Sequence, residues 1–248
     1  GKGAVLFTNN NGSYLHAIEL FDSGIDVAAI VDLRVRIDPE ITSVVALRGI
    51  EVLPASHISR VMGTRRVSAV EVAHSDNSGQ RRKISCDLLL VSGGWNPIVH
   101  LHSQSGSKPV YDEDLATFVP GTSVQNECSV GGCAGQFTLS ACLNTGLDAG
   151  IAAAEACALN CETAKAPVCD EDPALELLTC WEIPLPRKSS RAFVDFNSDV
   201  TSKDIRLAER EGYSSIELVK RYTTAGMGLD QGKTGNVNPS RLLSHLRY

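Results

Sequence analysis

The chain has 248 residues, enough for one large domain or two modest ones, with 43% hydrophobic and 21% charged residues. A formal net charge of −6 argues against a nucleic-acid-binding surface, which needs clustered Lys and Arg. No apolar run reaches the roughly 18 residues of a membrane span. The first residues, GKGAVLF, resemble neither a signal peptide nor a Met start, so we interpret the chain as a piece of a longer one. The cysteines, described below, lead us to expect a cytoplasmic protein.

Residues 3–33 have the pattern of a βαβ unit. The apolar run GAVLFT is followed by a polar turn, by a helical pattern with Leu15 and Ile18 on one face, and by a second apolar strand that ends in Asp32. A Rossmann domain carries its ribose-binding carboxylate at this place. The sequence therefore predicts a Rossmann-like beginning.

The turn between the first strand and its helix reads T-N-N-N-G-S-Y and not G-x-G-x-x-G. The glycines of that fingerprint let the backbone approach a pyrophosphate, whereas three asparagine side chains hinder the approach. This turn therefore argues against a working dinucleotide site in the first unit. On this basis we interpret Asp32 as an inherited or surface carboxylate.

The middle of the first domain predicts a helix, PEITSVVALRGI, and a third strand, IEVLP. The segments HISRVMG, RRVSAVEVAHS and RRKISCDLLLVSGG then alternate polar and apolar residues around turns, which indicates a β-meander before a final buried strand. The sequence LLLVSGGWNPIV is similar to the crossing between the NAD(P)H and FAD domains of two-dinucleotide flavoprotein reductases. We therefore predict an α/β chain with a partial Rossmann-like NAD(P)/FAD two-dinucleotide-binding fold, its NAD(P)H-type domain spanning residues 1–95.

Residues 96–162 are predicted to form the C-terminal part of an FAD/NAD-type dinucleotide-binding domain. They contain a strand, a glycine turn at 131–135 and a long alanine-rich helix. The amides at the start of such a helix, together with the helix macrodipole, favour an anionic or polar ligand.

Residues 163–192 carry several prolines and little periodicity, and we interpret them as a connector wrapped over the surface. After it, the segment DVTSKDIRLAEREGY contains a helix start with Thr201 as N-cap and Asp204 three residues later. The segment SSIELVKRYTTAGMG repeats this pattern. Residues 193–248 are thus predicted to be a small all-α module of two short helices and the start of a linker.

The eight cysteines are too sparse and too irregular for a secreted disulfide scaffold. Cys157 and Cys161 lie four apart in a helical pattern and share a face, so we expect buried, reduced thiols. No C-x-x-C occurs, and no metal site is predicted. We interpret the isolated pair His100 and His102 as surface residues and not as ligands.

The stretch FVDFNSDVTSKDIRLAEREGYSSIELVKRYTTAGMGLDQGKTGNVN, residues 193–238, resembles the helical segment of the alpha subunit of heterotetrameric sarcosine oxidases. The upstream two-dinucleotide pattern is similar to the same subunit in the same order, so the resemblance covers essentially the whole chain. That subunit is much longer. On this comparison the chain lacks the N-terminal G-x-G-x-x-G half of the FAD-like domain and the C-terminal folate-binding domain.

The helical module is also similar to the [2Fe–2S] domain of relatives such as opine oxidases and hydrogen cyanide synthase. The four cluster-binding positions of those relatives fall on Asp195, Asn197, Asp230 and Gly235, and none is a cysteine. Iron–sulfur clusters need thiolates, so we expect no cluster. A module this small needs other support, which we expect from docking onto the rest of the chain. The residues expected to make those contacts are Ile205, Leu207, Ile216, Leu218 and Val219.

The resemblance implies a subunit of a complex that oxidatively demethylates sarcosine to glycine and peroxide and transfers the one-carbon unit to tetrahydrofolate. It implies partner beta, gamma and delta subunits, FAD on the beta subunit, FMN between alpha and beta, and NAD in the alpha subunit. Sarcosine and tetrahydrofolate would bind outside this chain, and no catalytic residue is assigned to it. The cofactor-binding residues that the resemblance implies are Gly131, Gly132, Phe137 and Leu139.

Two alternatives stay open from the sequence. One is the alpha-type subunit of an opine oxidase or another secondary-amine oxidase, against which the missing cluster cysteines count. The other is a non-catalytic scaffold, a degenerate Rossmann pair that only docks flavin-bearing subunits. The T-N-N-N-G turn and the lost cluster ligands favour the scaffold.

Overall fold

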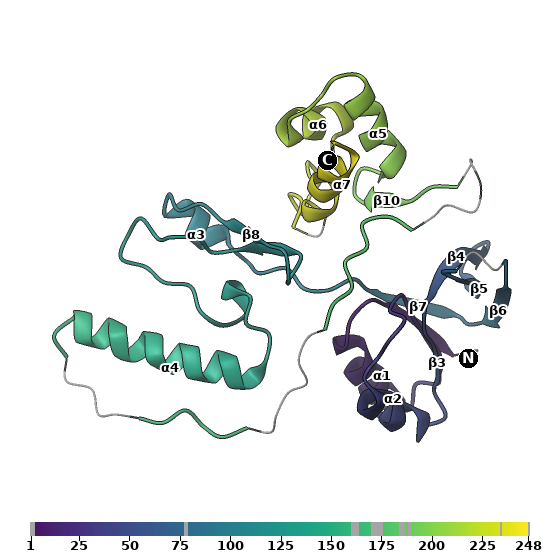
Figure 1. The fold of residues 1–248 in the computed structure, drawn as a ribbon, viewed down its shortest axis with the longest axis horizontal. Coiled ribbons are helices and arrows are strands. Elements are labelled where there is room, and N and C mark those ends of the chain that lie inside the picture. The colour runs from purple at the N-terminus through teal and green to yellow at the C-terminus, as the bar shows by residue number, and fades with distance from the viewer. Residues whose placement is uncertain are drawn as a thin grey trace.

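The computed structural model describes residues 3–76, 79–159, 164–169, 176–183, 187, 190–233 and 235–247. The described chain has three parts, which are a Rossmann-like sheet domain, a hairpin with a long helix, and a helical module (Figure 1). Within the described ranges, no helix combines the length and the apolar character needed to cross a membrane.

A four-stranded parallel sheet forms the centre of the first part. Its order is β3-β2-β1-β7, and every adjacent pair is parallel. The strands are β1 (Ala4–Thr8), β2 (Val27–Asp32), β3 (Glu51–Leu53) and β7 (Leu88–Ser92). Their apolar runs fit a sheet covered on both faces. The sheet and its layers confirm the predicted α/β Rossmann-like class.

Two helices, α1 (Gly12–Asp22) and α2 (Pro39–Ala46), cover one face of this sheet (Figure 1). Tyr14 and Ala17 of α1 are fully buried against sheet residues in a common core. The expected face of α1 was partly wrong, because Leu15 is 44% exposed and Ile18 is half-buried. The helix is rotated so that Tyr14 reaches the end of β2.

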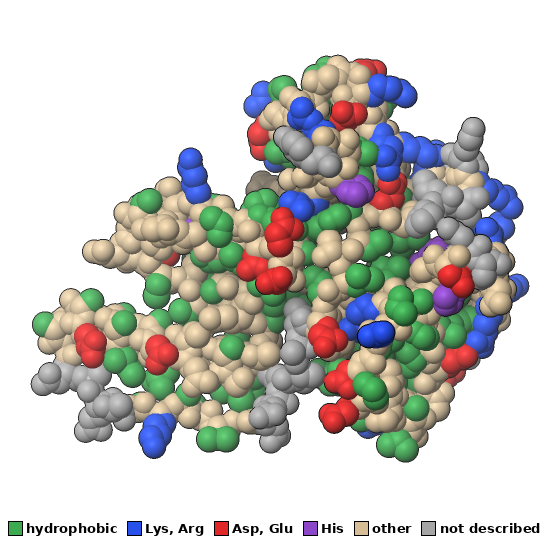
Figure 2. Space-filling view, viewed as in Figure 1, with side chains coloured by type: hydrophobic (Ala, Val, Ile, Leu, Met, Phe, Trp, Pro, Cys, Tyr) green, Lys and Arg blue, Asp and Glu red, His purple; other side chains and the backbone are tan. Residues whose placement is uncertain are grey.

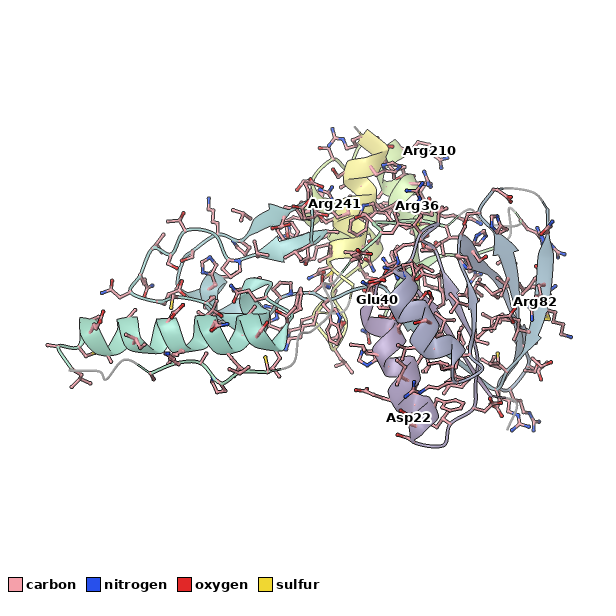
Figure 3. All side chains as sticks on the ribbon, turned by 60° about the horizontal axis from the view of Figure 1, so that its bottom comes forward. Asp22, Arg36, Glu40, Arg82, Arg210 and Arg241 are labelled. Atoms are coloured by element: carbon pink, nitrogen blue, oxygen red, sulfur yellow. The ribbon has the colours of Figure 1, made fainter. Side chains whose placement is uncertain are left out.

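An antiparallel meander covers the other face of the sheet. It consists of β4 (Ser56–Gly63), β5 (Val67–His74) and β6 (Arg81–Ser85), as the alternating pattern predicts. Val70 and Ile84 from the meander share a core with Val5 and Val31 from the sheet. Arg82 of β6 is exposed at the outer edge of the meander (Figure 3), and basic side chains gather along this edge of the molecule (Figure 2).

The second part holds the hairpin of β8 (Val110–Asp112) and β9 (Thr117–Val119), the short helix α3 (His100–Gln104), the 3₁₀ turn η1 (Gly131–Ala134) and α4 (Leu139–Ala156). Thr138 is the N-cap of α4, and its hydroxyl accepts a hydrogen bond from the Ala141 amide at 3.3 Å. None of its 18 residues is buried. An alanine-rich helix of this length has intrinsic propensity, but it normally gains stability by burying a face.

His102 on α3 is 2% exposed, so the expectation of a surface histidine was wrong. Its Nδ1 lies 3.0 Å from Glu127 Oε1, and its Nε2 accepts a hydrogen bond from the Gly121 amide at 3.1 Å. With both ring nitrogens engaged, this histidine joins α3 to the loop after β9. Its role here is structural.

The third part is the helical module, composed of β10 (Phe193–Asp195), β11 (Val200–Thr201), α5 (Ser202–Arg210), α6 (Ile216–Thr223) and α7 (Val237–Arg247). The predicted start of α5 is confirmed, because the Thr201 amide donates to Asp204 Oδ2 at 2.8 Å in a capping box. Helix α7 replaces the expected linker start. The periodicity of its sequence was overlooked.

Helix α7 completes a core within the module. Leu242 of α7 is fully buried with Ile205 and Val219, the residues expected to dock onto the rest of the chain. Leu218, expected to do the same, is 47% exposed. The expected docking contacts were therefore wrong: Ile205 and Val219 face the module's own interior, because a third helix is present to cover them.

Docking between the module and the hairpin instead uses a cation–π contact. The Arg241 guanidinium of α7 lies 3.9 Å from the Tyr111 ring centroid on β8, and 3.5 Å separates it from Glu113 (Figure 3). Such contacts contribute from about 0.5 to 2 kcal/mol. The polar edge of α7 thus connects the module to the hairpin.

The seven cysteines of the described ranges are free, and Cys161 lies outside those ranges. The expectation of buried thiols was wrong for most of them. Cys86 is buried in the sheet core, whereas Cys128, Cys157 and Cys180 are exposed. Cys157 falls at the end of α4, where no partner element of the described chain covers it.

Candidate functional site

A cavity of about 510 Å³ lies at the carboxyl ends of β1 and β7. Its walls come from residues 7–9 at the end of β1, 91–96 at the end of β7, the connector between 177 and 183, and the module. Open α/β sheets bind ligands in the crevice outside the carboxyl ends of their strands, where the strand order reverses. Strands β1 and β7 flank that point here, so the cavity lies where this fold places its ligands.

The cavity wall is aromatic and lacks positive charge. Among the described residues that line it there is no Lys, Arg or His, whereas Asp195 and Asp230 are present. The aromatic side chains of the wall are Phe7, Trp95, Trp181, Phe193 and Phe196. A pyrophosphate needs cations or free amides. This wall therefore suits a neutral or positively charged group better than a phosphate.

The four positions at which the resemblance predicts the missing cluster ligands line the same cavity: Asp195, Asn197, Asp230 and Gly235. Asp195 is buried, and its two carboxylate oxygens accept hydrogen bonds from the amides of Asn197 at 2.8 Å and Gly226 at 2.6 Å. A carboxylate thus fastens β10 to the glycine loop at 226–235. Asp195 serves as a loop anchor.

The interior of this glycine loop is filled by side chains. A Cβ added at Gly228 would lie 2.5 Å from Asn197 Cβ, and one at Gly226 or Gly232 would overlap Asn236. Gly226 also has a φ of 69°, a left-handed conformation that glycine adopts without strain. The glycines therefore allow Asn197 and Asn236 to pack into the loop.

The T-N-N-N-G turn after β1 binds another part of the chain. Asn9 Nδ2 donates to the carbonyl oxygen of Leu178 at 2.8 Å, and the Leu178 amide donates to the carbonyl oxygen of Asn9 at 2.9 Å. The Asn11 amide donates to the Glu176 carbonyl at 3.2 Å, and Asn10 pairs with Leu177 in an antiparallel bridge. Segment 176–178 of the connector therefore lies on the turn that would hold a pyrophosphate.

Asp32 is fully buried, so its interpretation as a surface carboxylate was wrong. Arg34 Nη2 donates to Asp32 Oδ2 at 2.7 Å, and the Tyr14 hydroxyl donates to the same oxygen at 2.9 Å. Burial, and after it the Asp32 charge, raise the pKa of the Tyr14 phenol far above its ordinary value. Arg34 Nη1 also donates to Asn11 and to the Glu176 carbonyl. Hydrogen bonds from protein groups thus engage the oxygens of the Asp32 carboxylate.

The predicted cofactor residues lie at a second place, around η1 and the start of α4. Gly131 is buried with a φ of 65°, and Gly132 is exposed, with open space where a Cβ would stand. Phe137 is half-buried, and Leu139 is the first residue of α4. The structure brings these four residues together within one turn and helix start.

Trp95 lies between the cavity and the predicted cofactor residues. It lines the cavity, and its ring centroid lies 6.4 Å from that of Phe137. Sequence reasoning overlooked both Trp95 and Arg34. A tryptophan directly after the Gly-Gly end of a buried strand was the available signal for the first; no local pattern signals that Arg34 neutralises Asp32.

Comparisons with known proteins show what the chain is similar to. Residues 189–248 match the family model described as the sarcosine oxidase A3 domain. The whole chain is 38% identical over 249 residues to the sarcosine oxidase subunit alpha of Rhizobium meliloti (strain 1021), and 96% of it is 33% identical to that of Corynebacterium sp. (strain P-1). The chain spans 24% and 25% of these proteins. The predicted resemblance to the alpha subunit is therefore confirmed.

Two solved structures share the fold. L-proline dehydrogenase from P. horikoshii superimposes with a TM-score of 0.65 at 17% identity, covering 98% of this chain and 45% of that one. Thioredoxin reductase from T. acidophilum superimposes with a TM-score of 0.52 at 18% identity, over 63% of this chain and 53% of that one. At these identities the similarity shows the fold alone.

Proposed function

We propose that this chain, which is similar over its whole length to a segment of sarcosine oxidase alpha subunits, is the dinucleotide-binding and scaffolding part of such a subunit. The complete complex would oxidatively demethylate sarcosine, form peroxide and transfer the one-carbon unit to tetrahydrofolate. Amine oxidation would take place on FAD and FMN held by, or shared with, a beta subunit. The chain itself supplies no catalytic residue in this proposal.

The similarity along the whole chain carries the proposal, since 38% identity extends through both the sheet domain and the helical module. The order of parts supports it as well. A parallel sheet with a meander, a hairpin followed by a glycine turn and long helix, and a helical module occur in the order that the resemblance implies.

We assign NAD to the turn η1 and the start of α4, with Gly131, Gly132, Phe137 and Leu139 as contacts. Open space at Gly132 allows a ligand to approach the backbone, and the 18-residue helix directs its N-terminal dipole to the same place. When bound, the dinucleotide would supply a nicotinamide and an adenine with a pyrophosphate between them. Gly132, Phe137 and Leu139 would orient it through backbone amides, whereas the Gly131 amide donates to Gln136 Oε1 at 3.1 Å and Gly131 would contribute close backbone approach.

Scaffolding is supported by the exposed helix α4. None of its 18 residues is fully buried in the described chain, and its start carries a 53% exposed Leu139. The curated relatives are about four times as long as this chain, as the 24% coverage indicates. We infer that further chain of the alpha subunit, and through it the beta, gamma and delta partners, covers this helix.

Two substitutions in the complete complex test the NAD assignment. Gly132→Ala adds a methyl group in open space, and Leu139→Pro removes one amide at the first helical position, where proline is tolerated. Both should lower the NAD content of the purified complex at least about tenfold, the loss expected when about 1.4 kcal/mol of contact disappears. Gly146→Ala, in open space within α4, and Leu139→Ala are the matched controls.

Sarcosine-dependent peroxide formation with tetrahydrofolate tests the activity itself. Normal NAD content in both variants would contradict the assigned contacts. A complex that assembles but oxidises another secondary amine in preference to sarcosine would favour the opine or amine oxidase alternative. Assembly without any bound dinucleotide would favour the non-catalytic scaffold, a reading that the occupied turn after β1 already supports.

A further inference from the structure

We propose that the first βαβ unit, residues 3–32, has become a docking site for the chain's own connector strand at 176–178 and no longer binds a nucleotide. The unit has the Rossmann architecture, with a turn after β1, a helix start and a carboxylate at the end of β2. Each of these three features normally contacts the dinucleotide. In this protein each of them is bound to another protein group.

The turn contributes a short main-chain ladder. The amides of Leu178 and Asn11 donate across to Asn9 and Glu176, at 2.9 and 3.2 Å, and Asn10 lies between them opposite Leu177. This pairing is β-augmentation, in which an extended segment adds to exposed backbone groups. A pyrophosphate would need the same amide of Asn11 at the start of α1.

The asparagine side chains provide specificity that glycines would lack. Asn9 Nδ2 donates to the carbonyls of Leu178 at 2.8 Å and Gly93 at 3.4 Å, so it joins the connector to the chain after β7. Asn10 Nδ2 donates to the Ser92 carbonyl at 3.3 Å. This explains the T-N-N-N-G turn: the G-x-G-x-x-G glycines are replaced by side chains that bind a peptide.

The carboxylate at the end of β2, where a Rossmann domain binds ribose, is neutralised by Arg34. Asp32 is held by Arg34 and Tyr14 and is fully buried, so its oxygens are engaged where a ribose hydroxyl would have to bind. Arg34, in turn, donates to Asn11 and the Glu176 carbonyl. The guanidinium therefore connects the former ribose site to the docked strand.

The docked strand positions the parts that follow it. Leu177 packs against Gly94, where a Cβ would approach its Cδ1 to 3.3 Å, and both residues line the cavity. Farther along, Glu182 forms an ion pair with Arg206 of α5, and Trp181 lies 5.8 Å from the Arg241 guanidinium of α7. Segment 176–182 is thus fixed to the sheet domain through its first residues and to the module through its last ones, which holds the module beside the cavity.

Hydrogen exchange on the complete complex tests this inference directly. The amides of Leu178 and Asn11 should be protected in the wild type, and 5 mM ADP-ribose or NADH should leave that protection unchanged. Leu178→Pro removes the donor of the central hydrogen bond and should accelerate exchange in 176–180 at least tenfold. Leu178→Ala keeps the donor, and its protection should match the wild type.

Dinucleotide stoichiometry separates this inference from the NAD assignment at α4. Wild type should hold no more than one NAD per chain, Leu178→Pro should gain no second one, and Gly132→Ala should leave Leu178 protected. Unprotected Leu178 in the wild type, its deprotection by ADP-ribose, or a second equivalent of NAD in Leu178→Pro would each overturn the inference. Failure of the α4 assignment alone would not change these exchange results.

Discussion

Arg34 and Asp32, two residues apart at the end of β2, form a buried ion pair in which Nη2 lies 2.7 Å from Oδ2. The Arg34 amide also donates to Asp32 Oδ1 at 2.8 Å, so both the backbone and the side chain of Arg34 bind the carboxylate. The carboxylate at the position where a Rossmann domain binds ribose is thus held by protein groups. Its partner supplies contacts to the connector, which makes the pair a junction between distant parts of the chain.

Arg34→Met should strongly destabilise the sheet domain. It leaves the Asp32 charge buried without its partner, which typically costs about 3–5 kcal/mol of the free energy of unfolding. Urea unfolding measures the loss. The exposed Arg36 (Figure 3) gives the control Arg36→Met, expected within about 0.5 kcal/mol of wild type. Equal free energies of unfolding for the two variants would show that burial of the Asp32 charge does not require Arg34.

Tyr14→Phe should change the alkaline end of the stability curve. Burial and the Asp32 charge raise the folded pKa of Tyr14, so its contribution is complete below the unfolded pKa of about 10 and is lost as the pH rises above it. At neutral pH the variant should lose about 1.5–3 kcal/mol, the usual contribution of a hydrogen bond to a charged group. Between pH 10 and 12 the wild type should lose more stability than the variant. Parallel curves in that range would contradict a raised pKa.

Leu242→Ala should unfold the helical module selectively. The side chain is fully buried between α5 and α6, and truncating such a leucine costs about 2–5 kcal/mol. Far-ultraviolet circular dichroism during thermal unfolding reports the change. Leu218→Ala, at a 47% exposed position on α6, should have little effect. A large effect at Leu218 with none at Leu242 would mean that the module relies on docking and not on its own core.

Replacing Asp195, Asn197, Asp230 and Gly235 together by cysteine should permit a [2Fe–2S] cluster to assemble. All four positions line one cavity, and such clusters are held by four cysteine thiolates. Anaerobic reconstitution should give a brown protein with the corresponding visible spectrum, whereas wild type stays colourless. The variant that retains Gly235 is the control and should bind less iron. A colourless four-cysteine protein would show that the loop, into which Asn236 packs, does not place the four thiolates around one cluster.

Local sequence patterns determined the order of elements. Apolar runs and alternation predicted the parallel strands and the meander, and the capping box at Thr201 and Asp204 predicted the start of α5, because these signals depend on residues a few positions apart. The lack of cysteine at the four cluster positions was equally evident from the sequence. Helix α7 was within reach of the same reasoning but was taken for the start of a linker.

Only the tertiary structure decided what the polar residues do. Asn9 finds its partner Leu178 across 169 positions, and Arg34 reaches Glu176 across 142, distances over which no local pattern carries information. Asp32 and His102 are buried for the same reason, because partners from other elements bind their side chains. A buried polar group requires a hydrogen-bond partner, but chain folding alone decides which one comes within reach.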